Sequence, residues 1–373
     1  MNLLRPRTAV YGWQRRLMLL LVLYACLSIA RADDARHDFL LFPSVDTLDT
    51  FNESEAEVAD SFQRPSLNML YSYNGGHFRF LGEYLWSSTE SELERLKVGW
   101  RAGDNTMWWF GRFHSTAKFW TSEYHHGQFM QNSITRPSIE EWEDESGPMP
   151  SHITGVSIEH TMPGAGEAAW NYGFSIGLAP KFVRDELQAF DMLDAESNHG
   201  LSYNARMAYR PDIFGDNQAG VLIGWNDIEV DSDSAPALAD LKDIRQLTIG
   251  VYGDWRFDDW RLLGNIVHFD HDMNYTTGSV SDVFVAGYLQ AEYRIAEDWT
   301  VFGRADWSTG EDNSEYLRLL PEFIAHRHML GVRWDFHRIQ SLTMEVADSS
   351  VPDEGSVHRT FKEVRFQWSA VFP

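Results

Sequence analysis

Alternation of polar and apolar residues is the feature of this sequence that most limits its fold. It is clearest at the C-terminus, where Val364, Phe366, Trp368, Ala370 and Phe372 share one phase and Arg365, Gln367 and Ser369 share the other. Successive side chains of a β-strand point to opposite faces, so a period of two predicts strands. No segment after residue 33 has a sustained helical period. The sequence therefore predicts an all-β protein.

Comparable runs follow one another along most of the chain. They lie at about 66–73, 77–88, 93–101, 106–113, 152–161, 168–179, 201–210, 219–230, 245–257, 259–270, 281–295, 299–308, 326–337, 340–347 and 364–372. The run at 259–270 alternates poorly, because Leu262 and Leu263 are adjacent. If both chain ends lie on the same side of a barrel, one further strand is needed between residues 38 and 57, with 39–42 as a candidate. The prediction is about 16 strands, or about 14 if two weak runs belong to loops.

Two features favour a transmembrane antiparallel up-and-down β-barrel over a soluble β-sandwich. Aromatic residues cluster at the ends of the runs, as they do in the interfacial girdles of membrane barrels; examples are Trp86, Trp100, Trp255, Trp260, Trp299 and Trp334. Short connections, such as 74–76 and 103–105, alternate with longer polar ones, such as 181–199, 231–243 and 271–280. The mean hydropathy of −0.36 excludes a bundle of apolar helices, but strands with one apolar face average to such a value.

The first 32 residues have the pattern of a cleaved export signal. Arg5, Arg7, Arg15 and Arg16 precede an apolar run at 17–27, which is too short to span a membrane as an ordinary helix. Ala30-Arg31-Ala32 supplies the small residues before a signal-peptidase site. We expect 1–32 to be removed and 33–373 to form the barrel. Lipidation of Cys26, the only cysteine, is the alternative, although Tyr24 fits that motif poorly. One cysteine excludes a disulfide framework.

The final strand, 364–372, carries a resemblance to the porin superfamily of Gram-negative outer membranes. Its alternating residues, with Trp368 and the aromatic Phe372 near the end, resemble the signal that the barrel-assembly machinery reads; Pro373 after Phe372 departs from that pattern. The resemblance covers nearly all of 33–373. It implies a location in the outer membrane, contact with outer-membrane lipid, a water-filled channel for small hydrophilic solutes, and a homotrimer.

The segment 114–151 is the third loop on the long-loop side and the longest without a strand pattern. Loops of such length inside a compact domain are usually functional. In porin-like proteins this loop folds into the lumen and narrows it, so the resemblance implies a constriction here. The residues that we expect to line it are Glu123, His125, His126, Glu140, Glu141, Glu143, Asp144 and Glu145.

Basic residues recur on the polar phase of the predicted strands. The predicted basic wall of the lumen consists of Arg79, Arg95, Arg101, Arg206, Arg256, Arg304 and Arg333, with Lys97, Arg210, Arg294 and Arg365 in the same phase. An acidic loop that faces such a wall would create a transverse field that sorts solutes by charge and dipole. Alternatively, the carboxylates pair with these arginines and merely hold the loop in place.

Histidines near the same loop raise the question of a metal. His114, His125, His126 and His152 lie in or beside 114–151 together with several carboxylates, which are ligands that Zn²⁺ accepts. Their spacing matches no metal motif, and adjacent residues of an extended chain point opposite ways. His326, His328 and His337 likewise fit ordinary lumen or interface positions. We therefore predict no metal and no cofactor.

Other classes of function fit the sequence less well. A net charge of −24 argues against a nucleic-acid partner. His268, Asp270, His271 and Asp272 could form part of a catalytic group at a strand end, but no nucleophile accompanies them, so we predict no enzyme. The predicted function is passive diffusion through the barrel. The alternative is a non-conducting or plugged barrel that acts as a receptor or envelope-interaction protein.

Overall fold

A computed structural model describes residues 35–51, 61–89, 91–124, 128–192, 199–352 and 358–373 of the chain. The predicted export signal at 1–32 and Cys26 lie outside the described residues. The described residues form a closed antiparallel barrel of 16 strands, which confirms the predicted fold class and the larger of the two predicted strand counts. Among these residues, no helix is both long and apolar enough to cross a membrane.

Two of the strands in the structure, β8 (Lys181–Val183) and β9 (Glu186–Gln188), form a small hairpin in a loop, and the others form the barrel. The barrel strands are β1 (Arg36–Phe51), β2 (Phe62–Gly75), β3 (Phe78–Ser87), β4 (Ser91–Arg101), β5 (Thr106–His114), β6 (His152–Pro163), β7 (Ala169–Leu178), β10 (Leu201–Arg210), β11 (Gln218–Val230), β12 (Leu241–Phe257), β13 (Trp260–Tyr275), β14 (Gly278–Ala296), β15 (Trp299–Thr309), β16 (His326–His337), β17 (Gln340–Pro352) and β18 (His358–Ala370).

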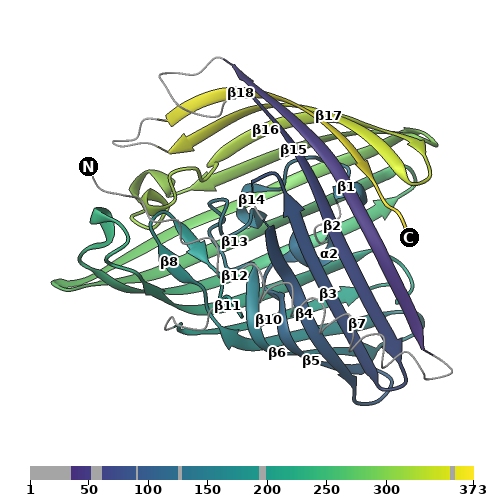
Figure 1. Cartoon of the computed structure of the whole chain (residues 1–373), viewed down its shortest axis with the longest axis horizontal. Helices are drawn as coiled ribbons and strands as arrows, with labels where there is room; N and C mark the ends of the chain where they lie inside the picture. Colours follow the sequence, from purple (N-terminus) through teal and green to yellow (C-terminus); the bar gives the residue numbers. More distant parts are fainter. Residues whose placement is uncertain (1–34, 52–60, 90, 125–127, 193–198, 353–357) are drawn as a thin grey trace, which may run out of the picture.

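The barrel closes between its first and last strands. β1 pairs with β2 on one side and with β18 on the other (Figure 1). In the β1–β18 pair, Ser44 lies opposite Ser369. β1 contains the predicted candidate 39–42 but is much longer. Beyond the end of β18, the backbones of Leu41 and Phe372 exchange two hydrogen bonds of 2.8 Å, which extend the seam. Closure pairs the two strands that would otherwise be the edges of the sheet, as a lipid environment requires.

Short turns join the strands at one end of the barrel, and most of the longer loops lie at the other. The turns include 76–77, 258–259, 297–298 and 338–339. The described parts of the loops hold one helix, α2 (Phe119–Tyr124), and five 3₁₀ turns: η1 (Gln128–Met130), η2 (Ser138–Glu140), η3 (Pro236–Leu238), η4 (Glu311–Asn313) and η5 (Leu317–Leu319).

The expectation of a long loop at 271–280 is wrong. Tyr275 and Gly278 are paired, so β13 and β14 are joined by the two-residue turn 276–277. The physical reason lies inside the barrel. His271 and Met273 are completely buried there, and their packing keeps this hairpin paired to its tip.

The outer face of the barrel is apolar. Val251, Val283, Leu289 and Leu330, on three strands, are 49–67% exposed, although each belongs to the apolar phase of its run. Exposed aromatic side chains lie near the short-turn end, among them Trp100, Trp255, Trp260 and Trp334. A wide apolar belt with an aromatic rim is the surface that a bilayer solvates. The barrel wall therefore lies in a membrane.

Part of the barrel interior is filled by an apolar core. Leu263, Val267, Phe269 and Met273 of β13 are buried inside, while Leu262 and Ile266 of the same strand are exposed outside. This explains the poor alternation of 259–270, because both faces of the strand are apolar. The inward residues belong to one cluster with loop side chains, including Phe119, Trp120, Phe182, Tyr316 and Phe323.

Candidate functional site

The segment 115–151 leaves β5, returns to β6, and contacts strands far away in the sequence. Arg304 of β15 donates to the carbonyl oxygens of Thr135, at 2.9 Å, and Arg136, at 2.7 Å. Glu345 of β17 accepts from the backbone N–H of Ile134 at 2.5 Å and of Thr135 at 3.2 Å. Both wall side chains are buried. Charge-assisted bonds of this kind are the stronger class of hydrogen bond, so they fix the middle of the segment to these strands.

A second set of contacts holds the two ends of the segment to each other. Lys118 is completely buried; its Nζ donates to Ser151 Oγ at 2.6 Å and to the carbonyl oxygen of Glu141. Glu140 accepts from Asn265 Nδ2 of β13 at 2.9 Å and from the Phe119 N–H at 3.2 Å. Burial lowers the pKa of Lys118 to about 8 and raises the pKa of Glu140.

The acidic residues that were predicted at a constriction divide into three groups. Glu140 and Glu143 are buried in contacts of the segment itself. Glu141, Asp144 and Glu145 line a cavity of 360 Å³. Glu123 lies apart from that cavity, 4.0 Å from Arg206 of β10. The predicted residues His125 and His126 lie outside the described residues.

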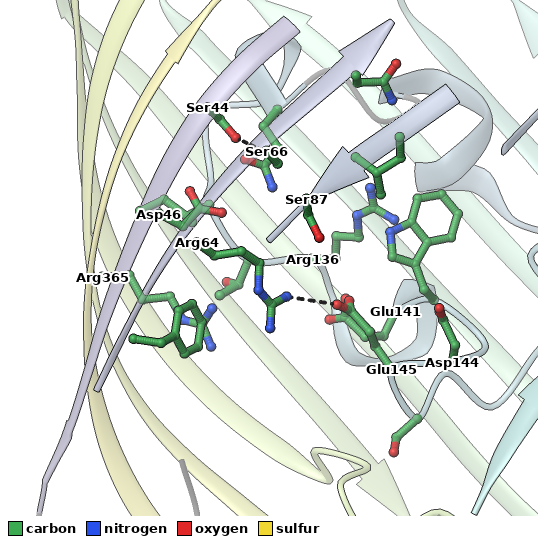
Figure 2. Close-up of a pocket in the computed structure, with 18 of the residues that line it drawn as sticks. Ser44, Asp46, Arg64, Ser66, Ser87, Arg136, Glu141, Asp144, Glu145 and Arg365 are labelled. Carbon is green, nitrogen blue, oxygen red and sulfur yellow. Dashed lines mark hydrogen bonds and ion pairs between the residues drawn. The ribbon is translucent and has the colours of Figure 1, made fainter. Parts of the chain in front are cut away.

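The cavity lies between the acidic run at 141–145 and strands at the barrel seam. Arg64 of β2 reaches towards Glu145, and its Nη1 lies 3.4 Å from Oε1; Asp46 of β1 and Arg365 of β18 lie near Arg64 (Figure 2). Acidic lining residues are Asp46, Glu141, Asp144, Glu145 and Glu322, and basic ones are Arg64, Arg136, Arg327 and Arg365. Carboxylates from the loop thus face guanidinium groups that mostly come from the wall.

The cavity residue Glu141 has an unusual acidity. It is partly accessible, and the surrounding loop removes much of its hydration. Burial, followed by repulsion from Glu145, raises the pKa of Glu141 to about 7, although Arg136 and Arg327 oppose the shift. Glu141 is therefore a carboxyl group that changes charge near neutral pH.

The arginines of the predicted basic wall have varied surroundings. Arg304 and Arg333 are buried and bond to loop carbonyl oxygens, the latter to that of Gln131 at 2.5 Å. Arg95 forms a buried ion pair with Glu83. Arg256 is half exposed and pairs with Asp216 at 2.5 Å.

Two others, Arg79 of β3 and Arg101 of β4, lie near the short-turn end. Among the described residues, the cavity takes its arginines from a different set, namely Arg64, Arg136, Arg327 and Arg365.

Sequence reasoning missed three of these four arginines, namely Arg64, Arg136 and Arg327. Arg64 precedes Pro65, a residue type that is unusual inside a strand, and the predicted strand began only at residue 66. In the barrel, Pro65 is nevertheless part of β2. Arg136 lies in the segment without a periodic pattern. Arg327 stands between two histidines, His326 and His328, whereas Arg365 stands between the apolar residues Val364 and Phe366, so only Arg365 was predicted on the inward phase.

The residues of the predicted assembly signal lie at the seam. Phe372 is bridged to Leu41 of β1, as described above. Trp368 of β18 donates from Nε1 to Gln340 Oε1 of β17 at 3.3 Å.

The residues considered for catalysis do not converge. His271 is completely buried, stacks on Tyr316 with ring centroids 3.9 Å apart, and contacts Gln246 Nε2 at 3.0 Å. His268 is exposed on the outer face of the same strand. The alternation of β13 therefore separates the two histidines.

Comparison with known proteins gives matches in structure but not in sequence. No protein-family model matches the chain, and no curated protein is significantly similar to it in sequence. An anion-selective porin from Comamonas acidovorans matches with a TM-score of 0.62 and 12% identity, over 91% of this chain and 100% of that chain.

Two further solved structures match over similar lengths. The outer membrane channel DcaP of Acinetobacter baumannii has a TM-score of 0.56 and 11% identity, over 91% of this chain and 97% of that one. OmpF of Salmonella typhi has a TM-score of 0.57 and 10% identity, over 90% of this chain and 97% of that one. Together with the apolar outer belt, these matches show that the chain has the fold of the Gram-negative outer-membrane porins.

Proposed function

We propose that this protein is a passive channel that carries small hydrophilic solutes or ions across the outer membrane. The single observation that carries the proposal is the charged cavity between the acidic run at 141–145 and strands at the barrel seam. The outer face of the barrel wall contacts lipid, and polar groups are arranged around a space inside the barrel. Such an arrangement favours the passage of hydrated solutes and needs no cofactor.

The segment 114–151 would narrow this channel. Its bonds to Arg304, Asn265 and Glu345 tie it to β13, β15 and β17. The apolar cluster lies against β11–β14, so water and solutes would be confined to the side next to β1 and β18. A cavity of 360 Å³ is small, which favours ions and small molecules over large nutrients.

Charge at the cavity would set the selectivity. Five carboxylates and four guanidinium groups line it, so their charges nearly balance. Opposite charges on facing sides create a transverse field without a strong net charge. We expect weak preference between cations and anions, in contrast to the Comamonas porin, which is described as anion-selective. The net charge of −24 says little about this preference, because charges outside the lumen contribute to it.

Neutralising the loop side of the cavity tests the proposal. In the triple variant Glu141→Gln, Asp144→Asn, Glu145→Gln, four arginines would face two carboxylates, and the reversal potential in a salt gradient should move towards anion selectivity. Two unit charges about 4 Å apart in water interact by about 1 kcal/mol. The ratio of anion to cation permeability should therefore change by roughly fivefold or more at low salt.

A matched control carries the same change in charge at the short-turn end. It consists of Asp104→Asn, Glu167→Gln and Glu297→Gln, three exposed residues in the turns at 102–105, 164–168 and 297–298. Its selectivity should stay near that of the unchanged protein. If both triple variants have the same reversal potential, the cavity is not the selective part of the channel.

The expected partners follow from the same fold. The outer belt would contact lipid, and Trp368 and Phe372 would serve as the signal for the barrel-assembly machinery. Vibrio cholerae OmpT, which matches with a TM-score of 0.58 and 11% identity, is described in a trimer form. A homotrimer is therefore our expectation for this chain.

A further inference from the structure

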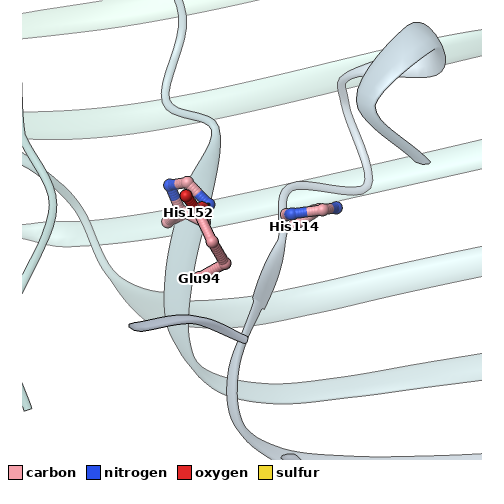
Figure 3. A group of neighbouring side chains, drawn as sticks. All are labelled: Glu94, His114 and His152. Atoms are coloured by element: carbon pink, nitrogen blue, oxygen red, sulfur yellow. Dashed lines mark ion pairs between the residues drawn. The ribbon is translucent and has the colours of Figure 1, made fainter. Parts of the chain in front are cut away.

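We propose that Glu94, His114 and His152 form a binding site for a divalent transition-metal ion, with Zn²⁺ as the most suitable occupant. The three side chains come from the neighbouring strands β4, β5 and β6, and all are buried (Figure 3). One potential ligand atom from each lies within 4.8 Å of the others. Two imidazoles and one carboxylate are a ligand set that binds zinc, with a fourth position left for water.

Two irregularities of the backbone bring these side chains together. Glu83 is paired with Arg95 and Tyr84 with Leu93, so Glu94 is the extra residue of a β-bulge. On the adjacent strand, Gly111 has φ +125°, and a Cβ there would lie 2.1 Å from the Leu96 carbonyl oxygen. After Gly111 the alternation of β5 stops, and residues 112–114 are all buried. Bulges often re-aim a side chain at a functional site.

In both histidines, the ring nitrogen that would not bind the metal makes the contact that is usual for metal-bound histidines. His152 Nδ1 lies 2.8 Å from Glu143 Oε1, and its Nε2 lies 2.9 Å from Glu94 Oε2. His114 Nδ1 lies 3.1 Å from the Thr121 carbonyl oxygen, so Nδ1 carries the proton and the lone pair is on Nε2. Metal-bound histidines usually donate their other ring N–H to a carboxylate or a backbone carbonyl.

His152 lies between two carboxylates, those of Glu143 and Glu94, and zinc would take a position between its Nε2 and Glu94. Other charged groups near His152 are Glu92 and Arg112, which are paired with each other, and Lys118 of the loop interacts with Glu143. Trp142 stacks on the His152 ring with centroids 5.2 Å apart, and its ring lies 5.7 Å from that of His114.

The position of the site suggests its role. His114 is the last residue of β5 and His152 the first of β6, so one ion would join the two ends of the segment 115–151. A metal that closes a long loop reduces the freedom of its ends. The ion would therefore hold the base of this loop in place, whether or not the barrel conducts.

Titration of the folded barrel with ZnCl₂ in detergent tests the inference. Calorimetry in two buffers with different ionisation enthalpies should show one zinc per chain and release of a proton. Glu94→Gln and His152→Gln should abolish binding. Glu143→Gln, which changes an outer contact, should weaken it by about 10- to 100-fold. His160→Gln is the matched control, because His160 is an exposed residue of the same strand.

X-ray absorption at the zinc edge of the unchanged protein keeps the test decisive if a variant fails to fold. It should show two imidazole nitrogens around the ion. A folded barrel that takes up no zinc would overturn the inference and leave an ion triad of Glu94, His152 and Glu143. Zinc binding that is unchanged in Glu94→Gln and His152→Gln would also overturn it.

Discussion

At the scale of single residues, the acidic run of the longest loop shows how neighbours in sequence acquire different tasks. Glu140 and Glu143 face protein groups and hold the loop, whereas Glu141 and Glu145 line the charged cavity. Glu140 and Glu143 thus bond to groups other than the predicted arginines, and Glu141 and Glu145 remain for the charged constriction that we propose. The environment of each carboxylate, rather than its identity, separates them.

The shifted acidity of Glu141 predicts a pH-dependent selectivity. Its pKa is raised to about 7, so the side chain is neutral at pH 5 and negative at pH 8.5. Because its pKa is raised, the folded state favours protonated Glu141. The contribution of this residue to the free energy of unfolding is therefore lost as the pH rises through 7. Over the same range the cavity gains a negative charge, and the reversal potential should move towards cations.

Measurements of the reversal potential between pH 5 and 8.5 check this prediction. Ordinary carboxylates titrate near pH 4 and stay charged throughout that range. In Glu141→Gln, the part of the change centred near pH 7 should disappear. If the reversal potential of this variant still changes with a midpoint near pH 7, a group other than Glu141 causes the change.

At the scale of elements, the loop is attached to the wall through buried charges. Arg304 of β15 pairs with Asp306 at 2.9 Å and donates to two loop carbonyl oxygens, and its side chain is fully buried. Removing one partner of such a pair leaves the other charge buried and unpaired. Loss of Arg304 should therefore release the loop rather than unfold the barrel, whose strands keep their own hydrogen bonds.

Arg304→Ala should destabilise the anchored loop by about 3–5 kcal/mol. Limited proteolysis of the folded barrel would reveal this as faster cleavage within 115–151, and electrical recordings would show larger current fluctuations. Arg294→Ala on the adjacent strand is the control, since its ion pair with Asp259 is exposed and should cost at most about 1 kcal/mol. Equal cleavage in both variants would contradict the anchoring role.

The strands and loops also show how much of the structure the sequence alone could predict. Alternation predicted the strands and their inward and outward faces, because lipid outside and polar groups inside select opposite side chains. It was weakest in β13, where Leu263 and Phe269 pack against loop residues rather than water. The long loop predicted at 271–280 failed for the same reason. The partners of Arg64 and Glu94 could not be predicted, because they depend on the path of a loop without periodicity and on a β-bulge.

At the scale of the whole molecule, the interior of the barrel has two parts of different chemistry. One side of the lumen is packed with apolar side chains from β11–β14 and the loops, and the other contains the charged cavity near the seam between β1 and β18. The apolar side would stiffen the barrel and reduce its free cross-section. The charged side is the part through which we expect solutes to pass. A channel and a plugged receptor differ only in whether that part is continuous.

Current through a single folded barrel is the most direct test of the central claim. The protein would be refolded in detergent, inserted into a planar bilayer at high salt, and held at a constant voltage. We predict stable unitary steps, whose size is small because the cavity is narrow and whose selectivity changes in the Glu141, Asp144 and Glu145 triple variant. A correctly folded barrel that inserts but passes no current would contradict the channel function and favour the plugged receptor.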